Sequence, residues 1–197
     1  MFSSYQRINN ISAFASSCLM TLLVVISIVS YAQLWTIGEP DGRLQVKPMN
    51  VVKAISRPYS RKEQEVAWFR FDVKADLDSL EVAWFRFDVK ADLDSLFNWN
   101  TKQLFVYVVA EYTNQKGFSN EVVIWDRIVR RKRDSKLNIE AARAKYPIRD
   151  PSLSFRNSSD VNFTLRYNVM PWIGALTYGT GAKVNEPVPF AKVQSRV

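Results

Sequence analysis

The chain has 197 residues, with 27 lysines and arginines against 19 aspartates and glutamates, which gives a formal net charge of +8. It contains no histidine and one cysteine, which excludes histidine-based catalysis, histidine metal ligands, a disulfide within the chain and a cysteine zinc site. Hydrophobic residues make up 47% of the chain, enough for one packed domain with or without an appendage and too many for a disordered protein.

The first predicted element is an apolar helix over residues 11–35. No charged residue lies between Arg7 and Glu39, and about 20 mostly apolar residues are enough for a helix to cross a bilayer. Tyr31 and Trp35 stand at the far end of the segment, where amphipathic aromatic residues favour the headgroup region. The segment therefore has the length and the flanking residues of a membrane anchor.

Two interpretations of this segment remain open from its residues. One is an uncleaved anchor, and the other is a signal peptide cleaved at the small-x-small site of residues 30–32. Because Arg7 precedes the segment, the positive-inside rule keeps residues 1–10 in the cytosol in both cases. Residues 36–197 then face the lumen or the exterior, where their basic balance suits acidic headgroups or an acidic protein surface and not nucleic acid. An ordinary solvated surface is the alternative.

A tandem repeat follows, because residues 65–80 and residues 81–96 both read EVAWFRFDVKADLDSL. Alternating apolar and polar residues predict that each copy is a strand with one buried face. Two identical copies indicate a recent duplication or an error in the gene sequence. We expect one copy to hold a core strand and the other to form an extra edge strand or a loop. Each copy ends in an acidic pair, which could meet a cation but is more commonly a solvent-facing feature of a strand end. These pairs are Asp76 with Asp78 and Asp92 with Asp94.

Six further stretches have the alternation or the β-branched content of strands. They are residues 44–55, 102–112, 121–129, 160–169, 172–178 and 182–188. A turn at residues 114–117 joins two of them into a predicted hairpin. Residues 136–146 are rich in alanine and end before Pro147, which predicts one short helix. The predicted fold is therefore mainly β: a β-sandwich-like domain with one short helix, behind a single N-terminal transmembrane helix.

The densest group of basic residues could contact lipid headgroups or an acidic partner, although an exposed, solvated loop is the commoner outcome. It comprises Arg127, Arg130, Arg131, Lys132, Arg133 and Lys136. We name this group the 127–136 cluster.

Three sites match the N-glycosylation motif Asn-x-Ser/Thr. Asn10 lies on the cytosolic side or in the bilayer, so we do not expect it to be used. Asn157 lies in a polar stretch, and Asn162 starts a predicted strand on its wet side. Both are therefore candidates for glycosylation.

No catalytic signature accompanies these elements. The sequence contains no nucleophile elbow, P-loop, dinucleotide fingerprint or metal-ligand pattern. Serines and lysines are plentiful, so a Ser–Lys pair stays open, although no spacing points to one. We expect a non-catalytic β domain without a cofactor, a metal or a small-molecule substrate.

The most specific motifs are FNWNTKQLF at residues 97–105 and VIWD at residues 123–126. Around them, an ordered series of segments runs nearly from end to end and resembles the family of signal peptidase complex subunit 3. The segments are residues 9–14, 87–112, 120–129, 136–137, 145–146, 168–181 and 187–190. The family pattern has one copy of the duplicated strand. Because the copy has an even number of residues, an extra one preserves the alternation of faces.

This resemblance implies a lumenal accessory subunit of the signal peptidase of the endoplasmic reticulum. It implies a single-pass type II protein with an uncleaved signal anchor over residues 11–35, glycosylated just before the NVMP segment. It further implies a domain packed against the catalytic subunit and other subunits, with no chemistry of its own while the complex removes signal peptides from nascent secretory proteins. A secreted or membrane-tethered β-sandwich binding module is the alternative.

The residues that we expect at partner surfaces come mostly from these motifs. They are Trp99, Asn100, Lys102, Gln103, Trp125 and Trp172. For each tryptophan, packing in the core is an equally open alternative.

Overall fold

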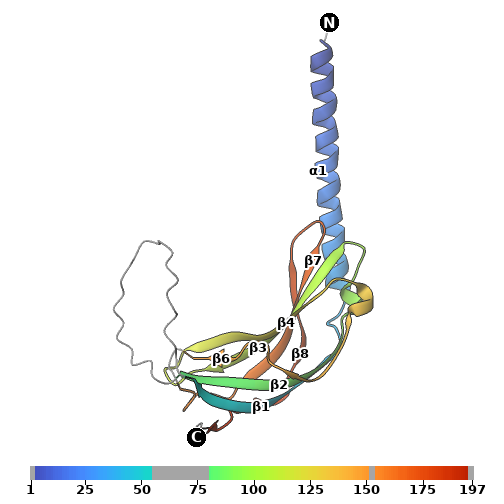
Figure 1. Cartoon of the computed structure of the whole chain (residues 1–197). Helices are drawn as coiled ribbons and strands as arrows, with labels where there is room; N and C mark the ends of the chain where they lie inside the picture. Colours follow the sequence, from blue (N-terminus) through green and yellow to red (C-terminus); the bar gives the residue numbers. More distant parts are fainter. Residues whose placement is uncertain (1–2, 55–79, 151–153, 195–197) are drawn as a thin grey trace, which may run out of the picture.

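A computed structural model of the chain describes residues 3–54, 80–150 and 154–194 (Figure 1). A long helix, α1 (Ser4–Thr36), precedes a domain built of strands. The strands are β1 (Gly42–Ala54), β2 (Leu80–Asp92), β3 (Thr101–Thr113), β4 (Ser119–Val129), β5 (Lys136–Arg143), β6 (Ile148–Arg149), β7 (Asn162–Pro171), β8 (Thr177–Lys183) and β9 (Val193–Gln194). Two short 3₁₀ helices, η1 (Asp94–Leu96) and η2 (Lys132–Asp134), lie in the connections.

Helix α1 is long and apolar enough to cross a membrane. It begins at the cap residue Ser3, whose hydroxyl accepts a hydrogen bond from the Gln6 amide. Its hydroxyl side chains bond within the helix: Ser17 Oγ donates to the Ala13 carbonyl and Thr21 Oγ1 to the Ser17 carbonyl. Such bonds satisfy polar groups that a hydrocarbon environment would otherwise leave without partners.

The strands form two sheets that pack face to face, which confirms the predicted β-sandwich. Sheet A has the order β5-β2-β1-β9, with β6 also paired to β2, and sheet B has the order β4-β3-β7-β8. All the pairings are antiparallel except β1 with β9. Aromatic rings join the sheets, because Phe85 of sheet A meets Phe163 of sheet B edge-on with their centroids 5.1 Å apart.

The second copy of the repeat forms strand β2, as one of the two was expected to do. Alternate side chains of this strand are buried in the core: Ala83, Phe85, Phe87, Val89 and Ala91. Strand β2 lies between β1 and β5 in sheet A, so this copy is an interior strand. The first copy up to residue 79 lies outside the described residues, together with Asp76 and Asp78.

The short helix predicted over residues 136–146 is wrong, because residues Lys136–Arg143 form strand β5. Leu137 lies opposite Ala91 of β2 and is buried, and Ile139 lies opposite Val89. A bulge follows, at which Ala141 has a φ of 49° and its amide donates to the Asp88 carboxylate. Pairing with β2 and burial of the two aliphatic side chains outweigh the helix preference of the alanines.

Two C-terminal strands were also misplaced. Residues 172–176 form a loop and not a strand, and β8 spans the boundary between the two predicted segments. Gly174 turns the chain in this loop with a φ of 119°, a conformation that suits glycine. Beyond β8, Val188 makes only an isolated bridge to Val161.

The remaining strand predictions are confirmed by β1, β3, β4 and β7. The predicted hairpin between β3 and β4 is present as well. At its turn the Asn114 side chain accepts hydrogen bonds from the amides of Lys116 and Phe118, both at 3.0 Å. Gly117 takes the positive φ that the turn requires, 82°.

Candidate functional site

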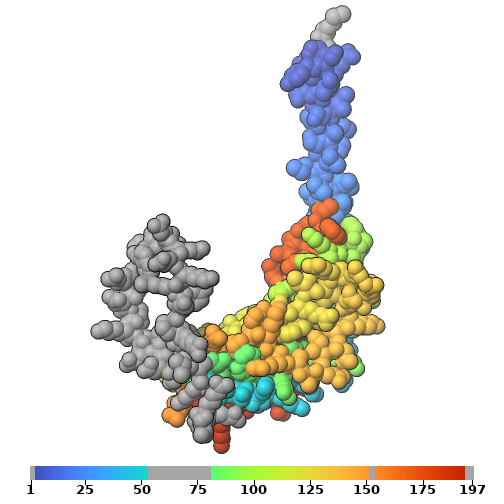
Figure 2. Space-filling model, in the orientation of Figure 1, coloured from blue at the N-terminus to red at the C-terminus, as the bar shows by residue number. Residues whose placement is uncertain are grey.

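The candidate site is a surface where the last turns of α1 meet two loops of the domain. Figure 2 shows the helix projecting from the domain, with contact confined to its C-terminal end. Among the described residues, no group of three or more cysteines, aspartates and glutamates is arranged to hold a metal ion. We name the contact between α1 and the loops of residues 97–100 and 171–177 the seam.

A pocket of about 210 Å³ lies within the seam. Its helix side is formed by Ser27, Ile28, Ser30, Tyr31 and Leu34, and its loop side by Pro171, Ile173, Gly174, Ala175 and Thr177. Gly174 lies close to the helix, because a Cβ atom there would lie 2.7 Å from Ser27 Oγ. Its φ of 119° also favours glycine, so another residue here would strain the loop and press on Ser27.

A hydrogen bond from Trp99 joins the loop of residues 97–100 to helix α1. Trp99 Nε1 donates a hydrogen bond to Gln33 Oε1 at 2.9 Å. The rest of the indole is exposed, at 58% of its full accessible area. Trp99 therefore holds the helix with its polar edge and presents its apolar body outward.

Asn100 joins the two loops to each other. It is only 2% exposed. Its side-chain amide donates to the Ile173 carbonyl at 2.7 Å, and its Oδ1 accepts from the Ile173 amide at 3.2 Å. The Asn100 carbonyl also accepts from the Trp172 amide at 2.8 Å. These bonds satisfy the polar groups of a buried asparagine and fix the loop of residues 171–177.

Trp172 and Lys102 continue the same surface. Lys102 Nζ lies 5.2 Å from the centre of the Trp172 ring, within the range of a cation–π contact. Trp172 is 67% exposed. Gln103 Nε2 donates to Met170 Sδ at 3.1 Å. The structure thus brings together four of the six residues expected at partner surfaces, whereas Gln103 follows Lys102 in β3 and points to the other face of the strand.

Trp125 lies apart from this group. It belongs to β4, is half-buried and packs against Phe87, with the ring centroids 5.5 Å apart. Its place between the two sheets matches the alternative of core packing.

Sequence reasoning missed two exposed apolar residues beside the seam, Leu176 and Tyr178. Both lie in a stretch that was predicted as a strand. A loop assignment for residues 172–176, which Pro171 and Gly174 could have suggested, would have identified Leu176 as a surface residue, whereas Tyr178 belongs to β8.

The linker after α1 also influences the domain electrostatically. Tyr167 of β7 packs so closely against Gly179 that a Cβ atom there would lie 2.3 Å from its hydroxyl oxygen. Burial of this hydroxyl, with a smaller effect of the negative charge of Glu39, raises the pKa of Tyr167.

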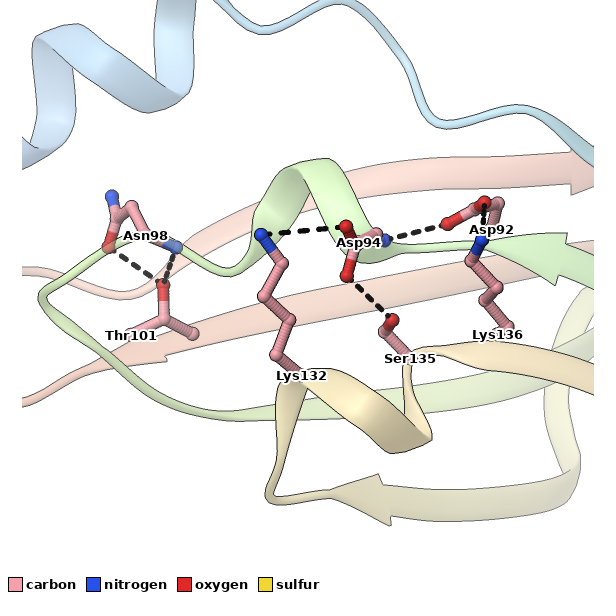
Figure 3. Close-up of polar contacts among 7 residues, drawn as sticks. All are labelled: Asp92, Asp94, Asn98, Thr101, Lys132, Ser135 and Lys136. Carbon is pink, nitrogen blue, oxygen red and sulfur yellow. Dashed lines mark hydrogen bonds and ion pairs between the residues drawn. The ribbon is translucent and has the colours of Figure 1, made fainter.

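Two lysines of the 127–136 cluster form ion pairs with the two aspartates at the end of the second copy of the repeat (Figure 3). Lys132 Nζ lies 3.5 Å from Asp94, and Lys136 Nζ lies 3.5 Å from Asp92. Ser135 Oγ donates to Asp94 Oδ1 at 3.2 Å. The acidic pair of the second copy therefore meets lysines, and η2 is held against η1.

The two glycosylation candidates are both exposed. Asn157 has a φ of 56° in the loop before β7, and Asn162 begins β7. The wet side predicted for Asn162 agrees with its position, because the neighbouring Phe163 is buried.

One family model and several individual proteins are similar to this chain. A family model described as signal peptidase subunit matches residues 1–81 and 78–193. The two matched stretches meet where one copy of the repeat gives way to the other, as expected if the family pattern holds a single copy.

Several relatives are similar over most of their length. Signal peptidase complex subunit 3 of Saccharomyces cerevisiae is 35% identical over 185 residues, covering 91% of each chain. The protein of the same name from Debaryomyces hansenii is 44% identical over 175 residues, covering 85% of this chain and 82% of the relative. Adipocyte-related X-chromosome expressed sequence 1 of Mus musculus is 36% identical over 190 residues, covering 96% and 95%.

Proposed function

Because this chain belongs to the signal peptidase subunit family, we propose that it is a membrane-anchored, non-catalytic accessory subunit of the signal peptidase complex. In this role it supports the catalytic subunit that removes signal peptides from nascent secretory proteins in the endoplasmic reticulum. Its partners are the catalytic subunit, other subunits of the complex and the membrane. The N-terminus lies in the cytosol, and the β domain lies in the lumen.

The seam is the observation that carries this proposal. The apolar run of α1, residues 11–29, is about 28 Å long, close to the thickness of a bilayer core. Gln33 lies about 6 Å beyond its end, and Trp99 is bonded to Gln33. The loops of the seam therefore stand at the level of the headgroups, where tryptophan is favoured.

This position suits a subunit that works on signal peptides. In a signal peptide the cleavage site directly follows the apolar segment, so cleavage takes place next to the membrane surface. A domain held at that level by the seam can support a catalytic subunit there. The lack of histidine in the chain agrees with chemistry that belongs to another subunit.

The seam also argues against the alternative of a released binding module. Cleavage after residue 32 would remove Ser27, Ser30 and Tyr31, which form most of the helix side of the pocket. It would also remove the contact of Gly174 with Ser27. A released domain would expose an apolar loop shaped for a helix that is no longer present.

Co-purification with a matched pair of glycine variants tests the proposal. Gly174→Val adds a side chain against Ser27, whereas Gly117→Val adds one where no atom lies within 4 Å. Both glycines have positive φ, so both variants strain the backbone, and only Gly174→Val adds a contact in the seam. We expect the wild type and Gly117→Val to retain the catalytic subunit in mild detergent and Gly174→Val to retain about tenfold less.

Two results would contradict the proposal. One is wild-type protein that purifies from membranes without any catalytic signal peptidase subunit. The other is a mature protein whose N-terminal residue is Gln33, found by N-terminal sequencing.

A further inference from the structure

Five of the exposed basic side chains on the outer surface of sheet A lie in two rows across three strands. They are Arg43, Lys47, Arg86, Lys90 and Arg143. We name this surface the basic face. It belongs to β1, β2 and β5, which are neighbours in the sheet, and it involves none of the residues of the seam.

The strand register places these charges directly opposite one another. Lys47 of β1 pairs with Arg86 of β2, and Arg86 pairs in turn with Arg143 of β5. Arg43 pairs with Lys90 in a second row. Like charges directly opposite each other on neighbouring strands are destabilising, so this arrangement lowers the stability of the free protein.

Described carboxylates compensate part of this charge from nearby. Asp88 and Glu140 lie beside Arg43 and Lys90, and so do Asp41 and Asp92. None of the five basic residues makes an ion pair with a described carboxylate. Asp88 lies between the two rows, where it accepts the amide of Ala141 and makes no ion pair with either row. Arg143 rests over the Trp84 ring at 4.0 Å, a contact that leaves its charge unneutralised.

The 127–136 cluster provides the contrast. Its two lysines next to the repeat are each within 3.5 Å of an aspartate. One of them, Lys136 of β5, lies opposite Asp92 of β2, at the edge of the basic face. The chain therefore pairs a lysine internally at this edge and leaves the five residues of the two rows without an ion pair to a described carboxylate.

The basic face is also hollowed. An open depression of about 490 Å³ lies over it, at the bulge of β5. Its polar lining has two basic residues, Arg43 and Lys90, two acidic residues, Asp88 and Glu140, and two amides, Gln45 and Asn138. An open depression with charged and amide side chains can hold an extended polypeptide.

From these observations we propose that the basic face binds an acidic polypeptide segment of a partner. The two rows are four residues apart along β1, which corresponds to about 13 Å. An extended segment has the same spacing between residues i and i+4. The best ligand therefore carries acidic residues four apart, with a neutral residue midway over Asp88.

A polypeptide suits this surface better than a lipid headgroup does. Figure 1 shows β1 leading away from the end of α1, with β1 and β2 on the side of the domain remote from the N-terminal part of the helix. Attraction to a charged bilayer is screened within about 8 Å at physiological salt. The proposal is independent of the identity of the complex to which the chain belongs.

Two double variants with equal changes of charge test the proposal. Arg86→Gln with Lys90→Gln removes one charge from each row. Arg130→Gln with Arg131→Gln removes two exposed charges from the 127–136 cluster and is the control. The full chain in phosphatidylcholine nanodiscs is titrated with a fluorescent peptide that carries glutamates four residues apart, and binding is followed by anisotropy.

We expect the face variant to bind the peptide at least about tenfold more weakly, and the control less than about twofold. We also expect Arg86→Gln alone to raise the melting temperature of the free protein, since it breaks the row of like charges. A basic face that served only to stabilise the sheet would give the opposite shift.

Three results would overturn the proposal. The first is equal weakening of peptide binding in both variants. The second is no binding by the wild type, or equal binding of a peptide with glutamine in place of glutamate. The third is a face variant that loses binding to phosphatidylserine vesicles while the peptide does not bind at all, which would assign the face to headgroups.

Discussion

A hydrogen bond between buried Tyr112 and Asp150 makes the stability of this domain depend on pH. Asp150 is 1% exposed and accepts a hydrogen bond from the Tyr112 hydroxyl at 2.9 Å and another from Asn120 Nδ2 at 3.3 Å. Burial, the hydrogen bond and the charge of Asp150 together raise the pKa of Tyr112 well above its usual range. The tyrosine therefore keeps its proton in the folded state under conditions that ionise it in the unfolded chain.

This shift predicts a loss of stability in alkaline solution. A raised pKa contributes stability that is fully present below the unfolded value of about 10 and is lost as the pH rises above it. We expect Tyr112→Phe to reduce this alkaline loss and to leave the part that comes from Tyr167, whose pKa is also raised. At neutral pH the same variant should lower the free energy of unfolding by about 1–3 kcal/mol, because Asp150 loses a donor. Urea unfolding at a series of pH values measures both effects.

The exposed Tyr178 supplies the control for this measurement. Tyr178→Phe should leave the alkaline slope of the wild type unchanged. A Tyr112→Phe variant that kept the wild-type slope would contradict the assignment of the shift to this residue.

The sequence identified residues that lie in the seam, but it did not predict which residues they contact. The FNWN motif singled out Trp99 and Asn100, and the structure places both in the seam. Their partners could not be foreseen, because the bonds of Asn100 reach Ile173, which is 73 residues away. A turn asparagine is usually solvated, so its burial follows only from the fold.

At the scale of elements, the alternation of apolar and polar residues predicted strands correctly. The alanine content of residues 136–146 predicted a helix where the structure has strand β5. Strands β2 and β7 show the predicted alternate burial along their length. The segment of β5 was misassigned because its alanines were weighted over the alternation of Leu137 and Ile139. The free energy of helix propensity is only tenths of a kcal/mol per residue, and pairing with β2 exceeds it.

Because the two copies of the repeat are identical, the same substitution can be compared at the same position of each copy. Phe85 and Phe69 occupy the same position in the two copies, and Phe85 is buried in β2 against Phe163. We expect Phe85→Ala to lower the free energy of unfolding by about 3–5 kcal/mol. Phe69→Ala should lower it by less, because the second copy and not the first forms β2. Chemical unfolding of both variants of the full chain makes the comparison.

Equal destabilisation by the two substitutions would contradict this assignment. It would mean that the copies exchange places in the sheet, which their identical sequences and even length permit.

At the scale of the whole molecule, the sequence predicted the parts and left their arrangement open. One apolar helix before a β-sandwich is present as expected. The division of strands between the sheets was not predictable, because β2 and β3 are consecutive in the chain yet lie in different sheets. Such long-range choices depend on which faces match in the folded core and not on local pattern.

The predicted orientation can be tested through the sequons. Asn157 and Asn162 are exposed and lie on the lumenal side in the proposed topology. We expect endoglycosidase treatment to increase the gel mobility of the wild type. Asn157→Gln with Asn162→Gln should have this higher mobility without treatment, and Asn10→Gln should behave as the wild type does.

A wild-type protein without sugar in a glycosylation-competent cell would argue against this topology. A sugar lost with Asn10 would place the N-terminus in the lumen and reverse the orientation.

Helix α1 continues without interruption from its apolar run into the seam, and this continuity has a mechanical consequence. Transmembrane helices adjust to the thickness of a bilayer by tilting. A flexible linker would let the helix tilt without moving the domain. Here the hydrogen bond of Trp99 to Gln33 and the contact of Gly174 with Ser27 hold the last turns of the helix against the domain. In the proposed topology the helix and the domain therefore tilt together as one rigid unit. Local thinning of the membrane is converted into a change in the angle and height at which the domain stands above it.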